Sequence, residues 1–263
     1  MNVLFGKPKW TDWRLAIEKL PITIHMLEFD NISNVVKYIK DNNINIVVPC
    51  TFDQMFFLID HKDKLNIKIA CPNNKKAIKL LDNKYYFYNF MNTNFKEYIP
   101  QNYISNCGSG KVTHNKVKYP CIFKLQKTNG GKGSFIIKNE RELNQSIKEK
   151  DYIIQEYISD PIEYSAHFYV DNKKILHSIF YCLENKEKNY IQCGRLLEYT
   201  KVDSICLDIF EKIFDKLNYN GFACIDFKLV NNKPKIFEIN PRLGGTLLND
   251  TNDFLEILNK LIV

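Results

Sequence analysis

The sequence predicts a small α/β lobe followed by a larger α+β body. Over the first 72 residues, short apolar strands alternate with helical patterns, which is typical of a parallel sheet with crossover helices. Further along, strands follow one another through tight turns such as Asp171-Asn172, which is typical of antiparallel hairpins. With 263 residues, the chain is long enough for one large domain or two smaller lobes.

In the first lobe, strands and helices are expected in alternation. The strands are expected at Asn2–Gly6, Ile22–Phe29, Ile44–Cys50 and Asn66–Cys71, and the helices at Asp12–Leu20, Ser33–Asp41 and Phe52–Lys64. The turn after the first strand reads Gly6-Lys7-Pro8 and the lobe has no G-x-G-x-x-G pattern. Dinucleotide binding is therefore not expected there.

The body opens with a helix expected from Asn74 to Met91 and then becomes rich in strands. A helix over Asn139–Lys150 has Glu142 three residues after Asn139, as in a capping box. An amphipathic helix over Val202–Leu217 ends before Asn220-Gly221, and a last helix is expected from about Leu247 to the end. The strands are expected at Tyr119–Gln126, Ser134–Lys138, Tyr152–Ile158, Ile162–Val170, Lys173–Leu183, Phe222–Val230 and Pro234–Asn240.

The composition argues against several classes of protein. A hydrophobic content of 45% with 25% charged residues is ordinary for a soluble globular protein. No apolar run reaches the roughly 18 residues of a membrane span, and the start has no signal-peptide pattern, so we expect a cytoplasmic protein without a membrane partner. The net charge of +7 is spread along the whole chain, which argues against a nucleic-acid partner.

The cysteines and histidines do not predict a metal site of their own. The eight cysteines contain no C-x-x-C pair, and Cys50, Cys121 and Cys224 lie in apolar runs. We interpret them as reduced, mostly buried thiols. The five histidines show no ligand spacing, so no zinc site is expected.

Three oxygen-bearing side chains are predicted to meet on the last hairpin. Glu238 and Asn240 are two residues apart and share one face of their strand. Counting outward from Asn232 at the turn places Asp226 opposite Glu238. Two carboxylates and an amide oxygen suit Mg²⁺. The alternative is a solvent-facing polar stripe, but the flanking residues are strongly apolar and an unneutralised acid pair is costly to bury.

Two further features indicate an anionic ligand, and each has a plain structural alternative. Residues Thr128 to Ser134 read T-N-G-G-K-G-S between two strands. The glycines leave backbone N–H groups free to wrap phosphate oxygens and Lys132 adds charge, although a hairpin turn gives the same letters and the pattern is not a Walker A motif. Lys124 lies within an apolar strand, where it either faces outward or has an anionic partner.

Taken in order, these features resemble the ATP-grasp superfamily of carboxylate–amine and carboxylate–thiol ligases. The resemblance consists of a lysine in a strand, a Gly-rich loop, the segment I-I-Q-E-Y-I, a glutamate, and an aspartate twelve residues before E-I-N-P-R. It covers roughly Asn74 to Asp250. It implies a Rossmann-like domain over residues 1–72 and an ATP-grasp domain over residues 73–263, whose two lobes, about 84–160 and about 161–263, clasp the nucleotide.

The resemblance also implies a role for individual residues. Asp226, Glu238 and Asn240 match the ligands of Mg²⁺, or of Mn²⁺ in its place. Arg242 and Lys124 match catalytic cations near the transferred phosphate. The nucleotide contacts are implied for Lys84, Lys124, Gly130, Gly131, Lys132, Gly133, Gln155, Glu156, Tyr157, Ile158 and Glu163. Lys84 follows an asparagine where the family often has an aspartate.

The activity that the resemblance implies is an ATP- and Mg²⁺-dependent ligase. Such an enzyme phosphorylates a small-molecule carboxylate, and an amine attacks the acyl phosphate. An ATP-grasp carboxylase, a phosphoryl transferase and a non-catalytic ATP-binding module are the alternatives. Gln192 to Arg195 either places Arg195 near a substrate carboxylate or leaves it on the surface. A homodimer is common among such folds, but nothing in the sequence shows one.

Overall fold

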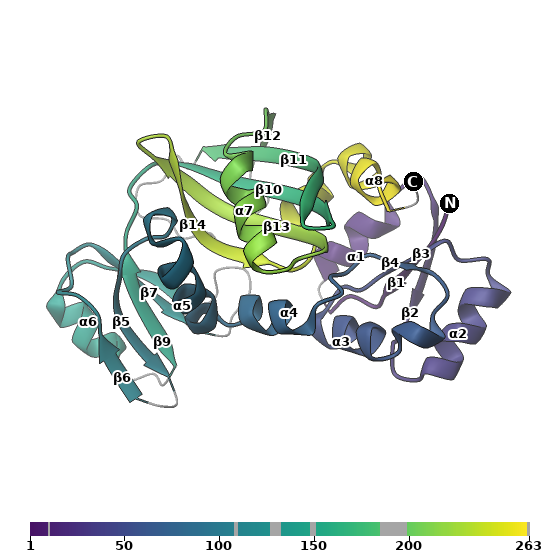
Figure 1. Cartoon of the computed structure of the whole chain (residues 1–263), viewed down its shortest axis with the longest axis horizontal. Coiled ribbons are helices and arrows are strands. Elements are labelled where there is room, and N and C mark those ends of the chain that lie inside the picture. The colour runs from purple at the N-terminus through teal and green to yellow at the C-terminus, as the bar shows by residue number, and fades with distance from the viewer. Residues whose placement is uncertain (10, 108–109, 127–132, 148–150, 185–198, 262–263) are drawn as a thin grey trace.

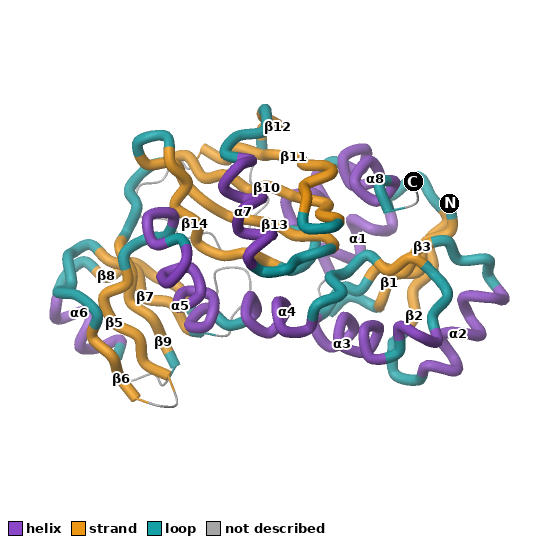
Figure 2. Tube along the Cα trace, viewed as in Figure 1, coloured by secondary structure: helices purple, strands orange, loops and turns teal. Residues whose placement is uncertain are grey.

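The computed structural model describes residues 1–9, 11–107, 110–126, 133–147, 151–184 and 199–261. Its strands form three sheets that follow one another along the long axis of the molecule (Figures 1 and 2). The N-terminal sheet is parallel and the other two are antiparallel, so the expected α/β lobe and α+β body are confirmed. None of the helices within the described residues has both the length and the apolar character to cross a membrane.

The N-terminal sheet has four strands in the order β2-β1-β3-β4. Its elements are β1 (Asn2–Gly6), α1 (Thr11–Glu18), β2 (Thr23–Leu27), α2 (Ile32–Asp41), β3 (Ile46–Val48), α3 (Phe52–Asp60), the 3₁₀ turn η1 (Lys62–Lys64) and β4 (Lys68–Ile69). Leu4 and Val47 pack under α2 and α3, whereas Val3 and Phe5 pack on the other face. Both faces are thus buried, which explains the continuous apolar strands.

The helix predicted from Asn74 to Met91 is two helices, and that prediction is wrong. α4 (Lys75–Asp82) ends before Asn83, and α5 (Lys84–Asn94) begins after it. The side-chain oxygen of Asn83 accepts hydrogen bonds from the backbone N–H groups of Tyr85 and Tyr86, so Asn83 is the N-cap of α5. Lys84 is therefore the first residue of a helix.

The third sheet, in the order β6-β5-β9-β7-β8, lies at the far end of the molecule (Figure 1). Its elements are η2 (Lys96–Tyr98), β5 (Asn102–Cys107), β6 (Gly110–Thr113), β7 (Cys121–Leu125), β8 (Ser134–Ile137), α6 (Glu140–Ser146) and β9 (Tyr152–Glu156). Phe123 and Ile154 form its core with Leu143 of α6. Because side chains alternate along a strand, Lys124 lies on the opposite face, away from this core.

The central sheet has the order β12-β11-β10-β13-β14. Its elements are β10 (Ile162–Asp171), β11 (Lys174–Glu184), β12 (Thr200–Val202), α7 (Leu207–Lys216), β13 (Gly221–Val230), β14 (Lys233–Asn240), η3 (Gly245–Asn249) and α8 (Thr251–Asn259). Two helix predictions begin too early: Thr200–Val202 pairs with β11, so α7 begins only at Leu207, and α8 begins only at Thr251.

One face of the central sheet is apolar and the other carries polar side chains. Phe168, Phe180 and Phe227 pack on the apolar face against Phe210 and Phe214 of α7. The alternate residues of these strands therefore lie on the opposite face. The residues of the candidate site lie on that polar face.

The C-terminal helix joins the two ends of the chain. Phe254 of α8 stacks on Phe5 of β1 with ring centroids 6.3 Å apart, and Figure 1 shows α8 close to the N-terminal end of the chain. The same core includes Tyr181 of the central sheet. The N-terminal and central sheets thus share one hydrophobic core through α8.

Candidate active site

The predicted metal-binding residues lie together on the polar face of the central sheet. Asp226 pairs with Glu238, and Asn240 pairs with Cys224. The predicted pairing of Asp226 with Glu238 is therefore confirmed, although the turn is not centred on Asn232. The turn has only two residues, Asn231 and Asn232, both with positive φ (51° and 60°). A register shift between Asp226 and Phe227 then brings Glu238, rather than its neighbour, opposite Asp226.

Strand β10 adds three polar residues to the same face. Glu163, Ser165 and His167 are spaced two apart, and Ser165 pairs with Asp226. Its hydroxyl donates a hydrogen bond to Asp226 Oδ1 at 2.7 Å. Glu163 is predicted as a site residue from the sequence, whereas Ser165 and His167 are not. The period-two pattern E-Y-S-A-H was the signal that could have found them.

Two lysines reach the acid pair from other elements. The backbone N–H of Lys84 donates to the carbonyl of Gln126 at 3.3 Å, which docks the start of α5 beside the end of β7. Lys84, Glu238 and Asn240 line a small cavity of about 20 Å³. Lys124 Nζ lies 5.3 Å from the ring centroid of Phe237. The structure thus brings Lys84 and Lys124 to the edge of the central sheet.

Arg242 follows β14 and lies against the end of this strand. Its Nη2 donates to Asn240 Oδ1 at 3.4 Å and its Nη1 donates to the carbonyl of Leu243 at 3.0 Å. The guanidinium carbon lies 5.8 Å from the ring centroid of Trp13 in α1. This contact holds Arg242 between the N-terminal lobe and the acid pair.

Burial and neighbouring charges shift the pKa values of both members of the acid pair. Burial raises the pKa of Asp226, and the nearby carboxylates of Glu238 and Glu163 raise it further. Burial also acts to raise the pKa of Glu238, but Lys84, the Asn240 amide, Lys124 and Arg242 together outweigh it, so that this pKa is lowered. Burial lowers the pKa of Lys124 to about 8, against the attraction of Glu238. An additional cation at Asp226 would relieve the repulsion between the two acids.

The donor set fits a hard divalent cation. Asp226, Glu238 and Asn240 offer carboxylate and amide oxygens on one face, which is the ligand type that Mg²⁺ prefers. Asn240 Nδ2 donates to Glu238 Oε1 at 3.1 Å, which holds the two side chains together. Among the described residues, no three His, Cys, Asp or Glu side chains converge as a metal cluster. Phosphate and water oxygens would complete the coordination of such an ion.

The predicted nucleotide strand connects the third sheet to the central sheet. Gln155 is buried and pairs with Ile122, two residues before Lys124, so it faces the same side as Lys124. The buried Ile158 accepts a hydrogen bond at its carbonyl from Lys228 Nζ at 3.2 Å. Tyr157 and Glu163 are half-buried. Burial raises the pKa of Glu163, against the charges of Lys228 and Lys124.

Two predicted residues have contacts that explain their local role in the fold. Glu156 Oε2 accepts a hydrogen bond from the backbone N–H of Gln101 at 3.1 Å, which fixes the entry to β5. Gly133 has a φ of +70°, and a Cβ there would lie 2.6 Å from Leu125 Cδ1, so the turn requires glycine. Gly130, Gly131 and Lys132 lie outside the described residues, as does the segment Gln192 to Arg195.

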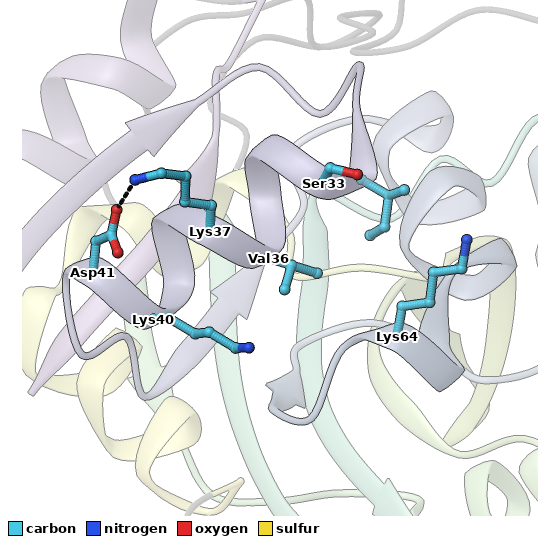
Figure 3. A pocket seen from close by; sticks show the side chains of 7 residues that line it. Ser33, Val36, Lys37, Lys40, Asp41 and Lys64 are labelled. Atoms are coloured by element: carbon cyan, nitrogen blue, oxygen red, sulfur yellow. Dashed lines mark hydrogen bonds and ion pairs between the residues drawn. The ribbon is translucent and has the colours of Figure 1, made fainter.

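Another cavity lies outside this constellation. It has a volume of about 460 Å³ and lies between α2 and η1, lined by residues such as Lys37, Lys40 and Lys64 (Figure 3). Lys37 is ion-paired with Asp41 at 2.5 Å. None of the predicted site residues lines it.

The sequence matches a protein family and several curated relatives. A family model described as ATP-grasp domain matches residues 81–246. The D-alanine–D-alanine ligase of Petrotoga mobilis is 27% identical over 247 residues, 88% of this chain and 79% of the relative. That of Campylobacter jejuni subsp. doylei is 26% identical over 168 residues, 58% of this chain and 49% of the relative. The match thus spans about half the length of the latter relative.

The fold is similar to that of solved ligases. Crystal structures of D-alanine–D-alanine ligase from Bacillus anthracis superpose with TM-scores of 0.65 and, for the complex with ATP, 0.64. They cover 99% and 100% of this chain, with 95% of those chains covered, at 14% sequence identity in both cases. At that identity the likeness concerns the fold.

Proposed function

This chain belongs to the ATP-grasp family, and we propose that it is an ATP- and Mg²⁺-dependent ligase joining a small-molecule carboxylate to an amine. ATP binding is the property of the family, and the relatives named above are ligases. The observation that carries the proposal is the pairing of Asp226 with Glu238 on a sheet face that Lys84 and Lys124 approach. We assign residues 1–72 to an N-terminal domain and residues 73–263 to the ATP-grasp domain.

The proposed chemistry converts a poor leaving group into a good one. A carboxylate resists attack because oxide would have to leave, whereas an acyl phosphate releases inorganic phosphate. A phosphoryl transfer of this kind depends on positioning and charge neutralisation rather than on a protein nucleophile. When bound, Mg²⁺ held by Asp226, Glu238 and Asn240 would supply charge neutralisation at the phosphates.

The residues of the chain have separate tasks in this scheme. Lys84 and Lys124 bind and orient the phosphates from two different elements, α5 and β7, which the hydrogen bond from the Lys84 N–H to the Gln126 carbonyl holds side by side. Arg242 holds the Asn240 oxygen and supplies positive charge where the phosphoryl group is transferred. Gln155, Ile158 and Glu163 line the nucleotide between two lobes. The first lobe, about 84–160, contains the third sheet, and the second lobe, about 161–263, contains the central sheet. The Gly-rich segment would exclude water from the acyl phosphate.

The test is a carboxylate-dependent half-reaction. ADP release is measured with Mg²⁺-ATP and pools of carboxylates and amines, with hydroxylamine added to trap an acyl phosphate as a hydroxamate. We expect carboxylate-dependent ADP and hydroxamate, both reduced more than about 100-fold in Asp226→Asn/Glu238→Gln, because the acid pair acts in the phosphoryl-transfer step.

A matched double variant controls for the loss of two negative charges. Asp215→Asn/Glu97→Gln removes exposed acids that pair with Lys173 and Lys233, and it should keep wild-type turnover. Bicarbonate-dependent ADP release would instead indicate a carboxylase, and a stable phosphorylated product a phosphoryl transferase. ATP binding without turnover across the pools would contradict the ligase proposal.

A further inference from the structure

A series of hydrogen bonds runs from the segment after β14 to Asp226. The backbone N–H of Gly244 lies 3.3 Å from His167 Nδ1, and His167 Nε2 lies 2.6 Å from Thr246 Oγ1. Thr246 Oγ1 lies 3.0 Å from Ser165 Oγ, which lies 2.7 Å from Asp226 Oδ1. Residues from β10, β13 and the segment after β14 are thus joined by four consecutive contacts.

The chemistry of the groups fixes the direction of every bond. A backbone N–H can only donate, so His167 Nδ1 is an acceptor. His167 is fully buried, and this burial lowers its pKa to about 3, so the ring is neutral and carries its proton on Nε2. Nε2–H then donates to Thr246, whose single hydroxyl proton donates to Ser165. The Ser165 hydroxyl proton donates to Asp226.

Gly244 packs the segment after β14 directly against the central sheet. A Cβ on Gly244 would lie 2.4 Å from Cys224 Sγ and 2.7 Å from His167 Cε1, so the backbone there touches the sheet directly. Cys224 Sγ also lies 3.4 Å from Ser165 Oγ. A thiol is a weak hydrogen-bonding group, so it is a poor substitute for the Thr246 hydroxyl.

We propose that Ser165, Thr246 and His167 are positioning residues that orient the carboxylate of Asp226 for a divalent cation. Ser165 occupies Oδ1, which leaves Oδ2 for the ion, and the aligned donors stabilise the ionised carboxylate. The same bonds hold the backbone at Gly244 against β10. The role of these residues toward the cation rests on the proposed function, whereas the direction of the hydrogen bonds does not depend on it.

The direction of the bonds is testable in the metal-free protein by the nitrogen shifts of the histidine rings. With ¹⁵N-labelled histidine, and His167→Gln for assignment, we expect His167 as the Nε2–H tautomer. Thr246→Val should shift the Nε2 resonance because the acceptor is lost, and Thr246→Ser should restore it. An Nδ1–H tautomer, or an Nε2 resonance unchanged in Thr246→Val, would overturn the proposed direction of the hydrogen bonds.

The effect on the cation is measured as Mn²⁺ affinity by electron paramagnetic resonance, with a non-hydrolysable ATP analogue present. We expect Ser165→Ala to bind Mn²⁺ about tenfold more weakly, which is the usual effect of losing a group that orients a ligand. Thr246→Val should lose less than Ser165→Ala, and Thr246→Ser should bind like the wild type. Thermal unfolding of each variant establishes whether it is folded. If Ser165→Ala is not folded, the Mn²⁺ affinities of Thr246→Val and Thr246→Ser test the proposal.

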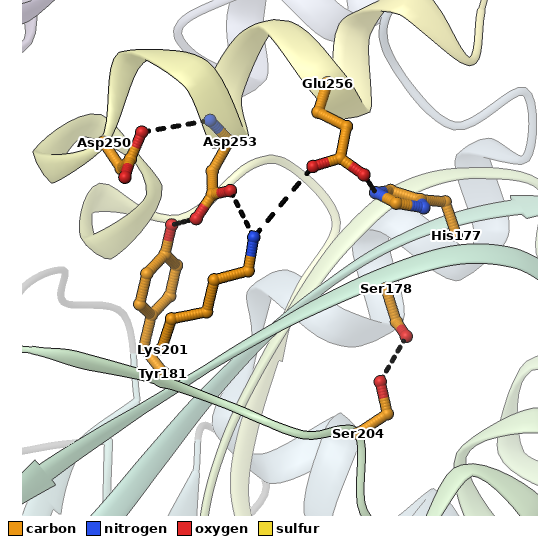
Figure 4. Close-up of polar contacts among 8 residues, drawn as sticks. All are labelled: His177, Ser178, Tyr181, Lys201, Ser204, Asp250, Asp253 and Glu256. Atoms are coloured by element: carbon orange, nitrogen blue, oxygen red, sulfur yellow. Dashed lines mark hydrogen bonds and ion pairs between the residues drawn. The ribbon is translucent and has the colours of Figure 1, made fainter.

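Ser178→Ala is the matched control. Ser178 and Ser204 form another hydroxyl–hydroxyl contact, at 2.9 Å, at an exposed position (Figure 4), so its loss should leave Mn²⁺ affinity unchanged. Wild-type affinity in Ser165→Ala and Thr246→Val, or weak binding in Thr246→Ser, would overturn the inference. Absence of Mn²⁺ binding in the wild type would contradict the proposed metal site instead. The nitrogen shifts would still decide the direction of the hydrogen bonds.

Discussion

At the scale of single residues, the site depends on charges that folding holds close together. Lys124 illustrates the cost, because burial lowers its pKa to about 8 although Glu238 attracts it. Its ammonium nitrogen lies 5.3 Å from the ring centroid of Phe237 and has acidic neighbours such as Glu238. A polyphosphate would add the missing negative charge on the open side of this lysine.

Lys124→Met should weaken ATP binding while leaving the fold intact. Methionine keeps the contact with Phe237 but removes the charge, and a hydrogen bond to a charged group contributes about 1.5–3 kcal/mol, or about 10- to 100-fold in Kd. Isothermal titration with ATP and with adenosine measures this, and the adenosine affinity should change much less. Lys212→Met, at an exposed position on α7, is the control. An equal loss for ATP and adenosine would argue against a phosphate contact.

His167 should make the protein less stable as the pH falls. Its pKa is lowered by burial from an unfolded value of 6.5 to about 3 in the folded protein. Below about 6.5 the unfolded chain therefore binds a proton that the folded protein does not, and stability falls by up to about 1.4 kcal/mol per pH unit. Urea unfolding between pH 7.5 and 5 measures this. His167→Gln should have a flatter profile, since the other histidines contribute equally to both proteins; identical slopes would contradict the prediction.

At the scale of elements, the sequence predicted the strands with a clear apolar pattern and missed β5, β6 and β12. β13 and β14 have apolar residues on one face, so the Asp226–Glu238 pair could be located before the bulge was known. β5 was missed because Asn102 and Ser105 are buried and hydrogen-bond each other at 2.6 Å. Such tertiary pairing is not visible in the local pattern. Thr246 was missed for the same reason, because its partners are on β10.

The break between α4 and α5 is the element on which the position of Lys84 depends. Asn83→Ala should destabilise the protein by about 1 kcal/mol, as expected for the loss of an N-cap, and should also weaken ATP binding because the first turn of α5 frays. Asn31→Ala removes a similar cap from α2, where Asn31 accepts from Ser33 and Asn34, and should cost similar stability without affecting ATP. Asn83→Asp should retain both properties. If Asn31→Ala weakens ATP binding equally, global stability rather than Lys84 is responsible.

At the scale of the whole molecule, α8 couples the N-terminal sheet to the central one. Tyr181 on β11 donates to Asp253 Oδ2 at 2.6 Å, and Lys201 on β12 donates to Asp253 Oδ1 at 2.5 Å (Figure 4). On its other side, α8 presents Phe254 to Phe5. The third sheet, in contrast, has a core of its own around Phe123 and Leu143. The N-terminal and central sheets should therefore unfold together.

This coupling is testable because both tryptophans lie within the first 13 residues. Phe254→Ala should destabilise the protein by about 3–5 kcal/mol, the usual cost of emptying an aromatic core position. It should shift the tryptophan-fluorescence and far-ultraviolet circular-dichroism transitions by the same amount, since α8 belongs to one core with both sheets. Leu143→Ala should instead separate the two transitions, because it weakens only the third sheet, which contains no tryptophan. A fluorescence transition that stays in place in Phe254→Ala would show that the N-terminal sheet is stable without α8.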